Sequence, residues 1–239
     1  MRSIPRLKSL IAASCCAALC ASALHAQTSG VDITAHVRLA ATAAKKPATD
    51  LANVVLWLAP LQPVSVVPPP VPHPPYQLLQ KDKQFHPHIL VVPVGSSVEF
   101  PNADPFFHNV FSLFNGKRFD LGLYEAGAHR YVRFDHEGVS YIFCNIHPEM
   151  GAIILSLSTP FYAVSAPDGS LVIHNVPPGS YQLHLWSENA QAATPSRVLQ
   201  VGSQSIHLED ILLHRSPSPL LNHKNKFGED YSPATSSPY

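Results

Sequence analysis

The chain has 239 residues with 16 basic and 16 acidic side chains, and only 13% of its residues are charged. This balance gives no support for nucleic-acid binding, which needs a basic surface. The 24 prolines favour sandwiches of short strands with many turns over long helices. The composition therefore predicts an all-β protein of one or two modest domains.

The first residues have the pattern of a cleaved export signal. Three basic residues within the first eight precede an apolar, small-residue stretch from Leu10 to Leu24, and both Ala21-Ser22-Ala23 and the later Ala26 offer cleavage sites. The apolar stretch of about 15 residues is shorter than the roughly 20 that a membrane-spanning helix needs. We therefore expect a signal peptide over residues 1–26, a periplasmic protein and no membrane span in the mature chain, which carries 13 basic against 16 acidic side chains.

Export changes the meaning of the cysteines. Three of the four, Cys15, Cys16 and Cys20, lie in the signal, where they match a lipoprotein cleavage motif poorly. Cys144 is then alone in the mature chain, and a free thiol is a liability in an oxidising compartment. A role for Cys144 as a metal ligand would explain why a single cysteine is present. The alternative is a buried, inert thiol.

Short strands dominate the chain after the signal. Residues 31–39 alternate apolar and polar side chains, which predicts a half-buried strand, and residues 54–58 form a short apolar strand. The Pro-dense stretch from Pro60 to Pro75 favours extended polyproline II and predicts a stiff linker.

The next block, from Tyr76 to Leu157, has repeated short strands separated by Gly and Asn turn residues, a spacing typical of a sandwich. Its expected strands cover residues 76–80, 89–94, 97–100, 109–112, 130–134, 140–144 and 152–157.

A third block begins near Thr159 and contains further strands around two turn motifs, A-P-D-G and P-P-G. Its expected strands cover residues 161–164, 171–173 and 181–186, with residues 197–201 and 205–208 as a hairpin around Gly202-Ser203. Residues 215–239 are rich in Ser, Pro, Asn and Lys, and we expect a disordered tail.

The motif C-N-I-H-P-E-M contains three potential metal ligands. It places Cys144, His147 and Met150 on one loop between two apolar strands. A second imidazole, His108, lies upstream in F-F-H-N-V-F. Two His, one Cys and a weak Met form the ligand set of a blue-copper electron-transfer site. Zinc is the alternative, although a structural zinc site normally has a fourth strong ligand in place of a thioether.

The middle block resembles the cupredoxins, in particular the plastocyanin, pseudoazurin and amicyanin branch. The similarity is carried by P-H-I-L-V-V-P-V-G, F-P-N-A-D, H-N-V-F and F-C-N-I-H-P-E-M, and the short ligand loop is most similar to that of amicyanin. The resemblance implies that His108, Cys144 and His147 are equatorial ligands of one copper ion and Met150 is axial. It also implies that Asn109 steadies the thiolate loop from outside the ligand set.

The outer block resembles the carboxypeptidase regulatory-like, transthyretin-like sandwich, through F-Y-A-V-S-A-P-D-G-S-L and N-V-P-P-G-S-Y-Q-L. The first strands of that family are missing just upstream, but residues 31–39 and 54–58 resemble them. We therefore expect a cupredoxin sandwich, residues 67–158 with its linker, inserted into or flanked by an outer sandwich of residues 27–66 and 159–214.

These observations predict a non-enzymatic periplasmic type 1 copper protein for one-electron transfer. The resemblance implies a redox partner such as a periplasmic dehydrogenase or a cytochrome c. A copper-binding protein for carriage or homeostasis is the alternative, and a structural spacer module would leave the copper motif unexplained. A multicopper oxidase needs further ligands, typically His-x-His pairs, and His86-Pro87-His88 is one isolated pair.

Overall fold

A computed structural model describes residues 30–40, 51–64, 75–113, 116–188, 190–192, 196–215 and 223–231. Every regular element in these ranges is a β-strand, so the all-β prediction is confirmed. No helix long and apolar enough to cross a bilayer occurs among them. The expected signal peptide and residues 65–74 of the Pro-dense linker lie outside the described residues.

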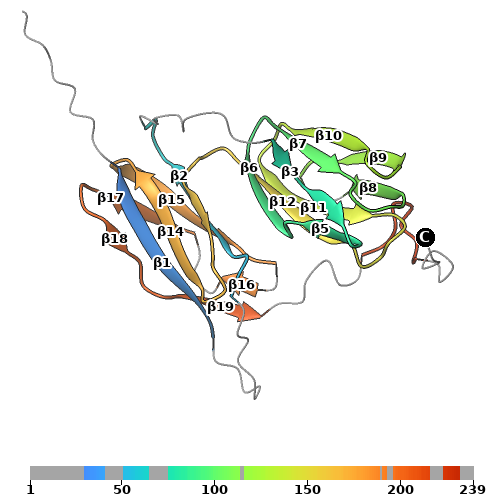
Figure 1. The fold of residues 1–239 in the computed structure, drawn as a ribbon. Helices are drawn as coiled ribbons and strands as arrows, with labels where there is room; N and C mark the ends of the chain where they lie inside the picture. The colour runs from blue at the N-terminus through green and yellow to red at the C-terminus, as the bar shows by residue number, and fades with distance from the viewer. Residues whose placement is uncertain are drawn as a thin grey trace, which may run out of the picture.

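Strands from both ends of the chain form the first of two bodies (Figure 1). One of its sheets contains β14 (Ser170–Val176), β1 (Val31–Leu39), β18 (Ile206–His207), β19 (Ile211–Arg215) and β16 (Ala190–Ala192). The other contains β13 (Tyr162–Val164), β2 (Val55–Pro60), β15 (Gly179–Trp186) and β17 (Arg197–Val201).

The alternation of β1 explains its place in this body. Its apolar residues are buried and its polar residues face outward, as a strand with one covered face requires. The core between the two sheets takes Ile33 and Val37 from β1, Leu56 and Leu58 from β2, and later residues such as Tyr181. Strands before residue 61 thus share one core and two sheets with strands after residue 161.

The second body lies between β2 and β13 in the sequence. Its larger sheet has the order β6 (Ile89–Pro93), β12 (Gly151–Leu157), β11 (Gly138–Cys144), β8 (His108–Ser112) and β9 (Phe119–Tyr124). A second sheet has the order β10 (His129–Phe134), β7 (Ser96–Pro101) and β3 (Tyr76–Gln77), and β4 (Leu79–Lys81) pairs with β5 (Gln84–His86). Phe100, Phe134 and Ile142 are among the residues of its own core.

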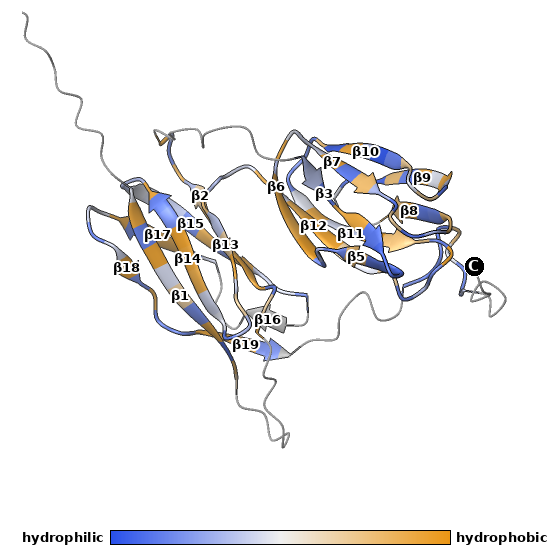
Figure 2. Ribbon diagram, viewed as in Figure 1, coloured by the Kyte–Doolittle hydropathy of each residue, from blue (hydrophilic) through white to orange (hydrophobic). Residues whose placement is uncertain are grey.

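An apolar interface joins the two bodies. Ile153 and Leu155 of β12 and Val91 of β6 pack in one cluster with Val55 of β2, while Ala152 and Ile154 of β12 face the core of the second body. Figure 2 shows β6 and β12 as largely apolar on the side of the second body nearest the first. These strands are covered on both faces, which accounts for their continuous apolar sequences.

Two expectations from the sequence are wrong. Residues 197–201 and 206–207 do not form a hairpin, because β17 pairs with β15 in one sheet and β18 pairs with β1 in the other. Residues 223–231, expected in a disordered tail, lie against the second body. Figure 1 shows residues 223–231, in red, beside the second body although β19 belongs to the first.

Candidate metal centre

The site lies where β11 ends and β8 begins. Val110 pairs with Cys144, which brings the start of β8 beside the end of β11 and places His108 next to the loop of residues 144–150. That loop is closed on itself, because the Cys144 N–H donates to the Met150 carbonyl (3.3 Å) and the Met150 N–H donates to the His147 carbonyl (3.1 Å).

Three of the four predicted ligands converge. The Cys144 Sγ lies 3.6 Å from the Nδ1 atoms of both His108 and His147, and the two Nδ1 atoms are 3.1 Å apart. A point in the plane of these atoms is about 2.0 Å from each, close to metal–nitrogen bonds of about 2.0–2.1 Å and metal–sulfur bonds of about 2.3 Å. All three side chains are buried, and no other group of His, Cys or carboxylate residues in the described ranges converges in this way.

Burial sets the protonation of the three groups. It raises the pKa of the Cys144 thiol, although backbone N–H groups of Asn109, Ile146 and His147 that donate to the sulfur act in the opposite direction. Burial also lowers the pKa of His108 and of His147, so both imidazoles are neutral near pH 7 and offer lone pairs. A metal ion would displace the thiol proton, since thiolate is the form that binds metal.

Asp104 orients one of these imidazoles. The His108 Nε2 donates to the buried Asp104 carboxylate (2.9 Å), which fixes the hydrogen on Nε2 and leaves Nδ1 free for a metal. The same carboxylate accepts the N–H groups of Asp82 (2.6 Å) and Lys83 (3.1 Å). Burial alone would raise the Asp104 pKa, but these hydrogen bonds hold it below its ordinary value.

The sequence analysis assigned no role to Asp104, although it lies in the F-P-N-A-D motif, four residues before His108. Asp82 and Lys83 both have positive φ, which is typical of a tight hairpin turn between β4 and β5. Asp104 therefore ties that turn to the His108 ring.

Of the two remaining predicted site residues, Met150 lies at the end of the 144–150 loop and Asn109 follows His108 on β8. Met150 is fully buried in the same apolar core as Cys144. The Asn109 carbonyl accepts the Asn145 N–H (2.8 Å), and its side chain donates to Asp120 (2.7 Å) and to the Gly122 carbonyl (3.0 Å). Asn109 thus joins the ligand loop to β9.

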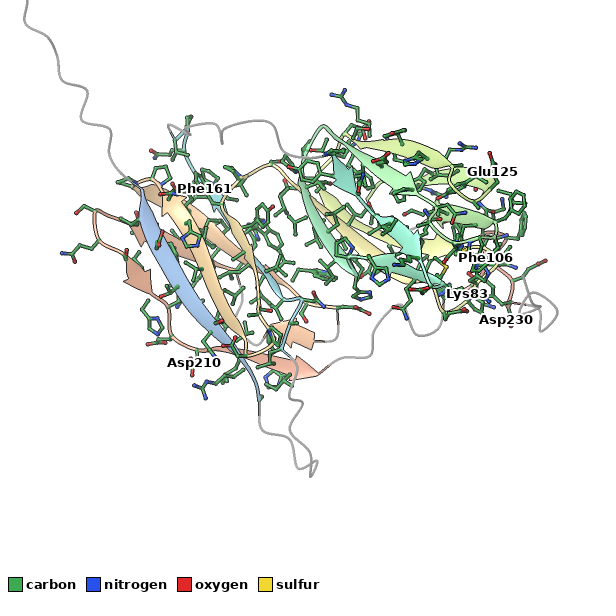
Figure 3. All side chains as sticks on the ribbon, in the orientation of Figure 1. Lys83, Phe106, Glu125, Phe161, Asp210 and Asp230 are labelled. Carbon is green, nitrogen blue, oxygen red and sulfur yellow. The ribbon has the colours of Figure 1, made fainter. Side chains whose placement is uncertain are left out.

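An aromatic ring covers the imidazoles from outside. The Phe106 ring lies 5.4 Å from the His108 ring and 5.5 Å from the His147 ring, measured between centroids. Figure 3 shows Phe106 and Lys83 together at the end of the second body where Asp230 also lies. His108 and Cys144 are fully buried, whereas His147 is 8% exposed, so His147 is the predicted ligand nearest to solvent.

No protein-family model and no curated protein matches the chain. Among solved structures it is similar to a purple cupredoxin from Nitrosopumilus maritimus, with 24% identity over 34% of this chain and 99% of that chain and a TM-score of 0.32. A copper-containing nitrite reductase from Thermus scotoductus shares 27% identity over 41% of this chain and 26% of that chain, with a TM-score of 0.35. An amicyanin variant in its Cu(I) state shares 18% identity over 36% of this chain and 86% of that chain, with a TM-score of 0.33.

Proposed function

We propose that the chain is a type 1 copper protein that transfers single electrons and is not an enzyme. The observation that carries the proposal is the buried triangle of one sulfur and two imidazole nitrogens, whose size suits one central ion. A thiolate favours Cu(I) and imidazole suits both oxidation states, so this donor set can hold copper through a one-electron cycle.

Met150 completes the proposed ligand set as a weak axial donor. Met150 is fully buried, and its carbonyl closes the loop by accepting the Cys144 N–H. Copper, when bound, would supply the redox couple, while the residues around it hold the donors in place and exclude water. The closed loop and the Asp104–His108 hydrogen bond support this role, because both limit the movement of donor atoms between oxidation states.

The slightly exposed His147 ring is the proposed exit for electrons toward a redox partner such as a periplasmic dehydrogenase or cytochrome c. Exposed apolar residues support a contact surface nearby: Phe107 precedes His108, and Leu123 pairs with Asn109.

We also infer that the signal of residues 1–26 directs export of the chain. We infer a carboxypeptidase regulatory-like identity for the first body, which the motifs around residues 161–183 support.

The test is the absorption and electron paramagnetic resonance spectrum of the protein after addition of one equivalent of Cu(II). We expect an intense visible thiolate-to-copper band that Cys144→Ser and His147→Gln abolish. His184→Gln is the matched control, since His184 stacks on Trp57 in the first body, 5.1 Å between ring centroids. Tight copper binding without the band would favour carriage, and preference for Zn(II) over copper would favour a zinc site.

A further inference from the structure

Residues 223–231, here called the strap, contact the ligand loop although they follow the first body in the sequence. The strap contains a turn closed by its own hydrogen bonds. The Asn225 side chain accepts the N–H groups of Phe227 (2.9 Å) and Glu229 (3.0 Å), and the Gly228 N–H donates to the Asn225 carbonyl (3.0 Å). Gly228 has a φ of +81°, a conformation that glycine adopts without strain.

Three polar atoms of the ligand loop are hydrogen-bonded by the strap. The Tyr231 hydroxyl donates to the carbonyl of Cys144 (2.9 Å). The Lys226 N–H donates to the side-chain oxygen of Asn145 (2.9 Å), and the His223 Nε2 donates to the carbonyl of Pro148 (2.8 Å). The strap therefore contacts the loop at both sides of His147.

Two further contacts fix the strap to the sheet beneath the loop. The His223 ring stacks on the Phe143 ring of β11, 4.1 Å between centroids. The Lys226 ammonium pairs with the Asp120 carboxylate of β9 (2.8 Å), whose other oxygen accepts from Asn109. The strap thus bridges β9, β11 and the loop of residues 144–150, which follows β11.

We propose that the strap is a positioning element for Cys144 and its loop, with Tyr231 and His223 as its main contacts; this rests on the proposed copper function. A loop whose carbonyls are held by a fixed partner opens less often than one whose carbonyls bind water. The strap therefore limits access to the Cys144 thiol and fixes the direction of the sulfur toward the two imidazoles.

The first test needs no metal. Alkylation of Cys144 in the metal-free full chain is followed by mass spectrometry of its peptide, comparing wild type with Tyr231→Phe and His223→Ala. Loss of one hydrogen bond shifts a local opening equilibrium about fivefold, so Tyr231→Phe should be labelled about fivefold faster. His223→Ala should be faster still, because it loses the Phe143 stacking as well.

Tyr181→Phe is the matched control, since its hydroxyl also donates to a backbone carbonyl, that of Pro177 (2.7 Å), but within the first body. We expect wild-type labelling of Cys144 in this variant. Equal labelling in all variants, or equal acceleration in Tyr231→Phe and Tyr181→Phe, would overturn the proposal.

The second test uses the copper-loaded protein. Tyr231→Phe should shift the thiolate-to-copper band and the reduction potential and speed copper loss to a chelator, with all ligands retained. An unchanged spectrum and potential would show that the strap does not position the sulfur. If the wild-type protein shows no thiolate-to-copper band, or if Cys144→Ser keeps one, the proposed copper function fails, while the metal-free labelling still tests the strap.

Discussion

At the scale of single residues, a buried carboxylate supports one of the proposed ligands. Asp104 holds the His108 ring and both N–H groups of the adjacent hairpin turn in one buried cluster. Its negative charge lies on the far side of the imidazole from the proposed metal position. Such a charge stabilises Cu(II) more than Cu(I), because Cu(II) carries the larger positive charge.

Asp104→Asn should therefore raise the reduction potential and weaken Cu(II) binding by about 10–100-fold, as expected for loss of a partner of a ligand. Voltammetry and competition with a chelator measure the two effects. Asp168→Asn is the control, because Asp168 is an exposed turn residue of the first body that bonds Ser170. A lowered potential in Asp104→Asn would contradict the proposed role of the charge.

Met150→Leu should keep copper and the visible band and also raise the potential. The swap conserves volume and costs less than about 1.5 kcal/mol of stability at a buried site. Removing the weak thioether leaves Cu(II), which needs donors more than Cu(I) does, with fewer of them. Voltammetry that showed a large fall in potential, or a protein without copper, would exclude Met150 as the axial ligand.

At the scale of elements, periodicity in the sequence predicted strands well where one face is covered. The expected bounds of β1 agree with the structure because its alternation reflects a single buried face. In β9 the burial of the side chains does not alternate and Gly122 has positive φ within the strand; the sequence analysis did not predict that strand. The apolar stretches of β6 and β12 were recognised as strands, but nothing local indicated which other body covers their second face.

The site divides in the same way. Cys144, His147 and Met150 lie within seven residues, so the sequence alone predicts them as a group, and the F-F-H-N-V-F motif adds His108. Tyr231 is 87 residues from Cys144 in the sequence, and its hydrogen bond exists only because the chain returns to the second body. The Ser, Pro, Asn and Lys content of that segment predicts disorder. The prediction is wrong for residues 223–231 because composition carries no information on contacts with residues far away in the sequence.

An ion pair between the two bodies should make the stability of the protein depend on pH. The His88 Nε2 lies 2.6 Å from the Glu188 carboxylate, and that hydrogen bond raises the His88 pKa above its ordinary value of 6.5. The folded protein thus holds this proton more tightly than the unfolded chain does. The contribution to stability is fully present below pH 6.5 and is lost as pH rises through the raised folded-state pKa.

Glu188→Gln should flatten the fall in melting temperature as pH rises from about 6 to about 9, compared with wild type. Thermal melts in this pH range measure the difference. Asp32→Asn is a matched control that breaks an exposed carboxylate–His174 pair within the first body. Parallel pH profiles for wild type and Glu188→Gln would rule out a role for the pair.

At the scale of the whole molecule, we propose that the second body is an insertion into the first. The first-body strands on either side of the proposed insertion lie side by side, because the Leu58 N–H donates to the Phe161 carbonyl (2.9 Å). Both tryptophans of the chain, Trp57 and Trp186, pack in the interface between the bodies. The interface therefore has its own fluorescence signal.

Replacing residues 67–158 with a short Gly/Ser loop should leave a folded, copper-free β-domain. Circular dichroism should show a cooperative β melt, because both sheets and the core of the first body remain. Tryptophan emission should shift to longer wavelength, since the deletion exposes Trp57 and Trp186. A disordered product would show that the first body needs the second to fold.

The pairing of β1 with β19 has a consequence for the order of folding. Synthesis proceeds from the N-terminus, and domains generally fold as units with the N-terminal ones first. The second body has all its strands by Leu157, whereas β1 must wait for β18 and β19. The strap follows later still. The ligand loop therefore spends an early period in a body that is already folded but has no strap, and that period is when an ion can enter most easily.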